Sequence, residues 1–152
     1  MAVKPIPDGY HSVTPHLCIM GAAHAINFYK KAFLATERMR FMEPGGKVAH
    51  AEIQIGDSIV MLSDEFPEMD ARSPRSIGGS PVSVYLYVDD VDVTFNRAIA
   101  AGAKVKRPVA NEFYGDRVGG LEDPFGRIWW ISTHMEDLSA EEIGKRATAA
   151  AS

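Results

Sequence analysis

The chain has 152 residues, of which 46% are hydrophobic and 24% charged, with a formal net charge of −4 at neutral pH. This length and composition are typical of one globular domain, or of two small modules that share a core. Apolar runs fall far short of the roughly 20 residues of a membrane span, the absence of a basic cluster argues against nucleic acid as a partner, and a single cysteine, Cys18, excludes an internal disulfide. We therefore expect a cytoplasmic protein without membrane partners, whose residues 1–11 form a short arm and not a secretion signal.

The first half of the chain is predicted to form a β-α-β-β-β module over residues 12–64. Alternation predicts a strand at Ser12–Met20, where Pro15 indicates a sheet edge or a strand start. Apolar residues at helical spacing predict an amphipathic helix over Ala22–Phe33. Three more strands follow, separated by turn sequences rich in glycine: Thr36–Phe41, Val48–Ile55 and Ser58–Ser63.

The second half repeats this order over residues 81–135. Between the halves, residues 65–80 are rich in Pro, Ser, Gly and acidic residues without periodicity, and this predicts a linker or a mobile lid. The repeated elements are a strand, a helix and three strands: Pro81–Asp89, Val91–Ala101, Lys104–Val109, Tyr114–Leu121 and Arg127–Thr133. The sequence therefore predicts two copies of one module.

The remaining residues, 136–152, are predicted to form a C-terminal helix and tail. Ser139, with Glu142 three residues later, is typical of a capping box for a helix over Leu138–Arg146. The Ala-rich end is expected to fray.

The clearest turn of the second module is Asp123-Pro124-Phe125-Gly126. Pro fixes φ at the second turn position and Gly accepts the positive φ that closes it. In the strand that follows, Trp129 and Trp130 are adjacent and must point to opposite faces. Trp129 is expected in the core and Trp130 on the opposite face of the sheet, toward a ligand cavity.

Several motifs occur in an order that resembles the vicinal-oxygen-chelate superfamily of glyoxalases, bleomycin-resistance proteins, fosfomycin-resistance enzymes and extradiol dioxygenases. These motifs look most like the PhnB-like branch: the helix Gly21–Phe33, His50-Ala51-Glu52, Tyr114-Gly115-Asp116-Arg117 and Asp123-Pro124-Phe125-Gly126. The resemblance covers Ser12 to Met135. It implies an α+β fold in which two βαβββ modules form an open, curled mixed sheet around a ligand cavity, often in a homodimer. Leu34 departs from the branch, which usually has a helix-ending glycine there.

Enzymes of this superfamily commonly bind one divalent metal ion through His and Glu on the first and fourth strands of each module. Here the corresponding positions are Thr14 or His16, then Met61, Ser83 and Trp130. Only His16 is a strong ligand, because thioether, hydroxyl and indole groups are poor donors for such ions. The usual metal centre is therefore expected to be missing, and no cofactor is predicted, although a divalent metal stays open as an alternative.

His50 and Glu52 are the predicted catalytic residues. They lie two residues apart in one strand, so their side chains share a face and suit an acid–base pair. A two-residue Gly56-Asp57 turn pairs Glu52 with Met61 on that face. Together with His16 they form the alternative metal site. The other histidines lie near element ends and are expected to be solvated: His11, His24 and His134.

Aromatic side chains predict how a ligand is held. Trp130 and three tyrosines offer a stacking surface for a flat ligand, or else fill the cavity mouth or a dimer interface. Arg117 is predicted to neutralise an anionic ligand or to pair with Asp116. The predicted ligand-binding residues are His16, Met61, Ser83, Tyr85, Tyr87, Tyr114, Arg117 and Trp130.

Three classes of function follow from these features. The leading hypothesis is a homodimeric protein that binds a small organic molecule without metal. The alternative is a metal-dependent lyase, isomerase or dioxygenase that uses His16, His50 and Glu52. The third is a structural interaction protein with a filled cavity. The sequence neither identifies the ligand nor decides whether the protein is an enzyme.

Overall fold

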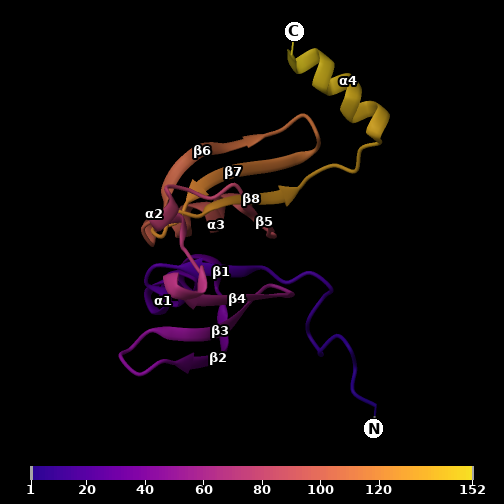
Figure 1. Cartoon of the computed structure of the whole chain (residues 1–152). Coiled ribbons are helices and arrows are strands. Elements are labelled where there is room, and N and C mark those ends of the chain that lie inside the picture. Colours follow the sequence, from indigo (N-terminus) through magenta and orange to yellow (C-terminus); the bar gives the residue numbers. More distant parts are fainter. Residues whose placement is uncertain (1, 152) are drawn as a thin grey trace.

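The computed structural model describes residues 2–151 and contains two modules of the same topology (Figure 1). The first module consists of β1 (His16–Ile19), α1 (Ala22–Phe33), β2 (Thr36–Met42), β3 (Val48–Ile55) and β4 (Ser58–Asp64). The second consists of β5 (Val84–Tyr87), α3 (Val91–Ala100), β6 (Lys104–Asn111), β7 (Asp116–Glu122) and β8 (Ile128–His134). The predicted α+β fold of two βαβββ modules is confirmed.

Each module folds into a four-stranded mixed sheet, with strand orders β1-β4-β3-β2 and β5-β8-β7-β6. β1 pairs parallel with β4 and β5 parallel with β8, while the other pairs are antiparallel. The predicted pairing of Glu52 with Met61 is observed. β1 and β5 are shorter than predicted, and β1 starts only after Pro15, which has no N–H to donate to a ladder.

Helices α1 and α3 lie between the two sheets and form one shared core with them. α1 contacts α3, and it also reaches the second sheet, where the Tyr29 and Phe33 rings lie 5.3 and 4.7 Å from the ring of Trp129. Trp129 is 1% exposed, as predicted for a core residue. Each sheet therefore covers the helical layer with one face and turns its other face outward.

Buried aspartates fix the ends of several elements. Asp64, at the end of β4, accepts hydrogen bonds from the backbone N–H groups of Gly21, Ala22 and Val48, at 3.0, 2.9 and 2.7 Å. Two of these N–H groups, those of Gly21 and Ala22, lie at the start of α1. The N-cap residue Gly21 makes no side-chain capping hydrogen bond, so Asp64 caps the helix instead. At its other end, Leu34 adopts the left-handed conformation with φ 57, the position where the related branch has glycine.

Asp123 organises the turn before β8. Its carboxylate accepts hydrogen bonds from the Tyr29 hydroxyl at 2.6 Å, from the Trp129 indole N–H at 2.9 Å, and from the backbone N–H groups of Phe125 and Arg127. Tyr29 comes from the first module, so this turn also joins the two modules.

The connection between the modules is more regular than its composition predicted. It contains the 3₁₀ turn η1 (Pro67–Met69) and the short helix α2 (Pro74–Ile77), and Phe66 and Ala71 form an isolated bridge. Pro at the first helical position explains how short elements form without apolar periodicity.

The chain ends in α4 (Ala140–Ala151), which begins as predicted, with the Ser139 hydroxyl accepting from the backbone N–H of Glu142 at 3.1 Å. The helix is longer than the predicted Leu138–Arg146, because α4 continues to Ala151, consistent with the high helix propensity of alanine. Both α4 and the N-terminal arm project from the body of the molecule (Figure 1). Among residues 2–151, no helix has the length and apolar character needed to cross a bilayer.

Candidate functional site

The outer face of the first sheet carries the predicted catalytic pair. His50 Nε2 lies 3.2 Å from Glu52 Oε2, and the His16 ring stacks on the His50 ring with centroids 6.1 Å apart. Met61 lies beside Glu52 across the strand pair. His16, His50, Glu52 and Met61 therefore share one face, as predicted.

The N-terminal arm adds Tyr10 to this face. A hydrogen bond from the Tyr10 hydroxyl, followed by weaker contributions from His50, lowers the pKa of Glu52 against the effect of burial. Burial, and then the Glu52 carboxylate, raises the pKa of Tyr10, whose ring lies 5.6 Å from the Arg38 guanidinium carbon. Glu52 is therefore an ionised hydrogen-bond acceptor at neutral pH. Sequence reasoning missed Tyr10 because the arm has no periodicity that relates it to the sheet.

His16 is poorly suited to carry a proton. Burial lowers its pKa, and the electrostatic interaction with the neighbouring His50 ring lowers it further. The described residues, 2–151, contain no group of three or more His, Cys, Asp or Glu side chains arranged to hold a metal ion. The alternative trio of His16, His50 and Glu52 therefore shares a face without forming a metal-binding geometry.

The outer face of the second sheet carries a groove of about 320 Å³. Four of its lining residues are predicted ligand-binding residues: Ser83, Tyr85, Tyr114 and Trp130. The Trp130 ring lies against Gly120, where an added Cβ would come within 2.5 Å of it. Burial, and then Tyr85, raises the pKa of Tyr114 to about 12, so its hydroxyl stays protonated.

Tyr87 takes part in a separate cluster around Asp116, at the start of β7. The Asp116 carboxylate accepts from the Tyr87 hydroxyl at 2.8 Å and the Tyr85 hydroxyl at 3.3 Å, and it contacts His134 Nδ1 at 2.7 Å. Burial opposes ionisation of Asp116, but these hydrogen bonds outweigh it and lower its pKa. His134 also contacts Asp137 at 2.7 Å.

His134 is 51% exposed, as expected of a solvated histidine, but it also contacts Asp116. The signal that sequence reasoning missed is the strand register, which sets Asp116 opposite His134 in adjacent strands. Hydrogen bonds with Asp116, and then Asp137, raise the pKa of His134. The exposure expected of His11 and His24 is observed.

Arg117 does not pair with Asp116. Its guanidinium forms two hydrogen bonds with Asp92 of α3, at 2.8 and 2.9 Å, and a third with Asn111 at 3.1 Å. The reason is strand alternation, since Arg117 and Asp116 are adjacent in β7 and point to opposite faces. Arg117 therefore lies on the helix side, away from the groove.

The two outer faces lie on opposite sides of the molecule, because the helices fill the space between the sheets. One chain therefore does not bring His50 and Glu52 to the groove that Tyr114 and Trp130 line. Apolar side chains on or beside these faces remain exposed: Phe41, Met42, Tyr85 and Tyr87.

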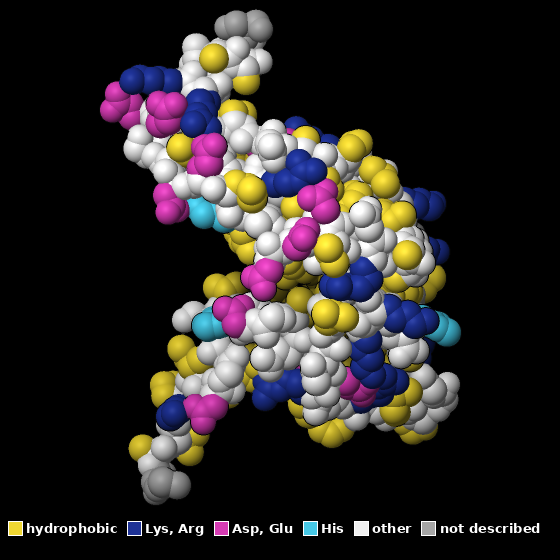
Figure 2. Space-filling view, turned by 180° about the vertical axis from the view of Figure 1, so that it is seen from behind, with side chains coloured by type: hydrophobic (Ala, Val, Ile, Leu, Met, Phe, Trp, Pro, Cys, Tyr) yellow, Lys and Arg dark blue, Asp and Glu magenta, His cyan; other side chains and the backbone are white. Residues whose placement is uncertain are grey.

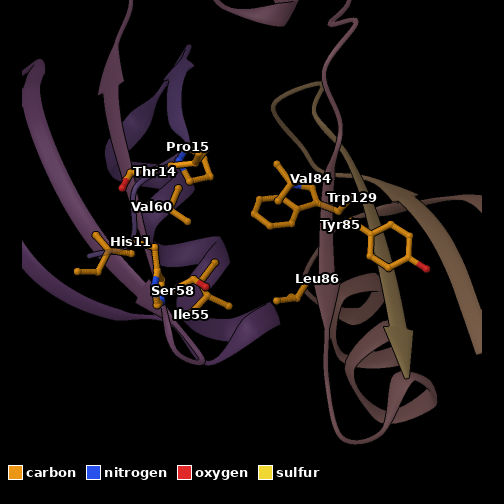
Figure 3. Close-up of a pocket in the computed structure, with 12 residues that line it drawn as sticks. His11, Thr14, Pro15, Ile55, Ser58, Val60, Val84, Tyr85, Leu86 and Trp129 are labelled. Atoms are coloured by element: carbon orange, nitrogen blue, oxygen red, sulfur yellow. The ribbon is translucent and has the colours of Figure 1, made fainter. Parts of the chain in front are cut away.

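A different pocket, of about 260 Å³, lies between the modules where the helices leave the sheets uncovered. Val84, Leu86 and Trp129 of the second module point toward Pro15, Val60 and Ile55 of the first (Figure 3). The Tyr85 ring points away from this space (Figure 3). Seen from behind, a hollow with apolar walls separates the two halves (Figure 2).

Comparisons with known proteins agree with this architecture. The family model described as the Glyoxalase/Bleomycin resistance protein/Dioxygenase superfamily matches residues 11–131. An uncharacterized protein of Mycobacterium tuberculosis is 42% identical over 135 residues, which cover 87% of this chain and 79% of that protein.

Solved structures share the fold. The crystal structure of TioX from Micromonospora sp. ML1 has a TM-score of 0.63 and 23% identity, and covers 85% of this chain and 100% of TioX. A PhnB protein of Bacillus cereus has a TM-score of 0.60 and 21% identity, covering 81% of this chain and 99% of that one. The family model extends over most of the chain, from the end of the arm into β8, and both modules have the expected topology. The chain therefore belongs to the Glyoxalase/Bleomycin resistance protein/Dioxygenase superfamily.

Proposed function

We propose that this protein binds a small organic molecule in the groove of the second sheet, as a homodimer and without the usual metal centre of its superfamily. The observation that carries the proposal is the convergence of Ser83, Tyr85, Tyr114 and Trp130 on one groove. Aromatic rings provide a large contact area at low entropic cost, and the Tyr114 hydroxyl oxygen can accept a directional hydrogen bond from the ligand.

The volume and lining of the groove favour a flat ligand of modest size. About 320 Å³ lies at the small end of the range typical of ligand pockets. Gly120 leaves room for the Trp130 ring, so a ligand meets the indole face rather than its edge. Arg107 lies at the rim with its charge paired to Glu112 at 2.7 Å, which leaves the aromatic rings as the main contact surface.

A second copy of the chain is part of this proposal. His50 and Glu52 are hydrogen-bonding groups on the first sheet, but the helical layer separates them from the groove of their own chain. A symmetric dimer can place the first sheet of one copy over the groove of the other, and it would also bury exposed side chains such as Phe41 and Tyr87, which are 58% and 60% exposed. His50 and Glu52 then bind the ligand held by the partner.

The metal-free part of the proposal rests on donor chemistry. Met61, Ser83 and Trp130 occupy three of the four positions that carry metal ligands elsewhere in the superfamily, and none is a strong donor for a divalent cation. The metal-dependent alternative would require zinc, nickel, manganese or iron to raise the melting temperature, and His50→Ala to abolish that rise.

A thermal-shift screen of metabolites and antibiotics, followed by tryptophan fluorescence, tests ligand binding. A true ligand stabilises the wild-type protein and changes its fluorescence, because Trp130 is one of only two tryptophans. Trp130→Leu should abolish both effects. The control Phe66→Leu removes an aromatic ring beside Lys47, outside the groove, and should leave both unchanged. A screen without any stabilising compound would remove the basis of the proposal.

Mixing two inactive variants tests whether the site is shared between copies. Trp130→Leu damages the groove and Glu52→Gln damages the opposite face, so each variant alone should lose binding. In a mixed dimer, one site combines the intact groove of one chain with the intact first sheet of the other, and about one quarter of all sites should recover after exchange. Absence of recovery, despite exchange shown by native mass spectrometry, would refute the shared site.

A further inference from the structure

Arg127 is a buried cation that forms no direct ion pair with another described side chain. It directly precedes β8 and is 8% exposed. One guanidinium nitrogen donates to the backbone carbonyl of Cys18 at 3.1 Å, whereas Nε is buried and has no partner. Within residues 2–151, Arg127 forms no ion pair with a carboxylate. A guanidinium has five N–H donors, so most of its hydrogen-bonding capacity is unused.

The buried carboxylates of the core are already occupied by other donors. Asp123 accepts from Tyr29, Trp129 and two backbone N–H groups, one of them that of Arg127 itself. Asp64 accepts hydrogen bonds from three backbone N–H groups. A buried charge without a partner is costly, and a native protein that retains one calls for an explanation such as an absent ion or ligand.

Arg127 lines a cleft of about 500 Å³ between the two modules. Most of the walls are apolar: Val13, Pro15, Leu17, Val82 and Val84. Ser80 and Ser83 add hydroxyl groups, and His16 and Tyr85 complete the lining. The cleft shares Val13, Pro15, Val84 and Tyr85 with the pocket beside Trp129, so apolar space continues inward between the sheets. The Arg127 guanidinium therefore adjoins the apolar space between the two modules.

We infer that this cleft binds an organic carboxylate, with the carboxylate on Arg127 and the apolar body between the modules. One guanidinium balances one negative charge, and its planar N–H groups match a carboxylate. A phosphate monoester carries close to two charges and would leave one uncompensated against apolar walls. The inference goes beyond the proposed function. Ser83 and Tyr85 line both spaces, but Arg127 and Val82 line only the cleft and not the groove of the second sheet.

Titration of the full-length protein with sodium octanoate, 1-octanol and octyl phosphate, followed by calorimetry, tests the inference. Octanoate should bind most tightly. Arg127→Met should weaken octanoate binding by at least about tenfold and leave octanol binding unchanged, while Arg127→Lys should fall between. Equal affinity for octanoate and octanol, or unchanged octanoate binding by Arg127→Met, would overturn the inference. Tighter binding of octyl phosphate would overturn the assignment to carboxylates.

A surface variant keeps the test decisive if the Arg127 variants do not fold. Val82 lines the cleft and is 64% exposed, so Val82→Asp adds a negative charge there without disturbing the core. Octanoate binding should weaken about tenfold and octanol binding much less. Val105→Asp is the matched control, because Val105 is 53% exposed on β6 and lies outside the cleft. Equal effects of the two variants would contradict the inference.

Trp130→Leu separates this inference from the proposed function. Trp130 does not line the cleft, so this variant should lose groove ligands but bind octanoate normally. Loss of octanoate binding in Trp130→Leu would refute a separate site in the cleft.

Discussion

Replacing Asp123 by asparagine tests the hydrogen-bonded turn that joins the two modules. Asp123 is 3% exposed, and its two oxygens accept four hydrogen bonds at 2.6 to 3.0 Å. Asparagine has nearly the same shape, so the change alters charge and donor pattern rather than packing.

The expected loss of stability can be worked out from these contacts. If the remaining oxygen keeps the two backbone N–H groups, the new NH₂ group faces the Tyr29 hydroxyl and the Trp129 indole N–H. The hydroxyl can rotate to accept, but the indole is only a donor and stays unpaired, which costs about 1–3 kcal/mol. Loss of charge from the remaining hydrogen bonds adds about 1–2 kcal/mol. Asp123→Asn should therefore lower the free energy of unfolding by about 3 kcal/mol, or the melting temperature by about 6–12 °C.

Urea unfolding followed by circular dichroism and tryptophan fluorescence measures this loss. Tyr29→Phe in both backgrounds completes a double-mutant cycle, and it should cost less once Asp123 is asparagine. Asp8→Asn is the control, because Asp8 pairs with Lys4 at the surface and should change stability by less than about 0.5 kcal/mol. An Asp123→Asn loss no larger than that of the control would refute the reasoning.

Three further outcomes are expected. Leu34→Gly should raise the free energy of unfolding by about 1 kcal/mol in urea titrations, because glycine relieves the left-handed conformation; a loss would show that the exposed side chain matters more than the strain. Tyr10→Phe should raise the pKa of Glu52, measured by carboxyl NMR titration, because the hydroxyl lowers that pKa in the wild type; an unchanged value would place the arm elsewhere in solution. Asp116 raises the pKa of His134 in the folded state, so protonated His134 stabilises the fold. This contribution to the free energy of unfolding should be complete below pH 6.5, the ordinary pKa of histidine, and should disappear as the pH rises through the raised pKa. In the His134→Gln variant, the free energy of unfolding should lose this pH dependence. If the variant and the wild type show the same pH dependence, the prediction is contradicted.

Local patterns predicted most of the fold and part of the site. The strand parity that set His50 beside Glu52, and Trp130 opposite Trp129, depends only on alternation along a strand, so these assignments held. The same rule explains why Arg117 does not pair with Asp116, which was one of the two roles predicted for it. Register across strands, which sequence proximity does not reveal, placed His134 against Asp116.

The sequence by itself determined the two repeated modules, their turns and the faces of their strands, because these follow from propensity and periodicity over a few residues. Only the tertiary structure decided how the modules pack. Tyr29 and Phe33 of α1 pack on Trp129 of the other module, and this turns both polar sheet faces outward, so that one chain does not enclose the predicted site. It also decided that Arg127 is buried at the inter-module cleft with its Nε unpartnered among residues 2–151. Contacts between residues about a hundred positions apart depend on the packing of whole helices and sheets, which no local pattern encodes.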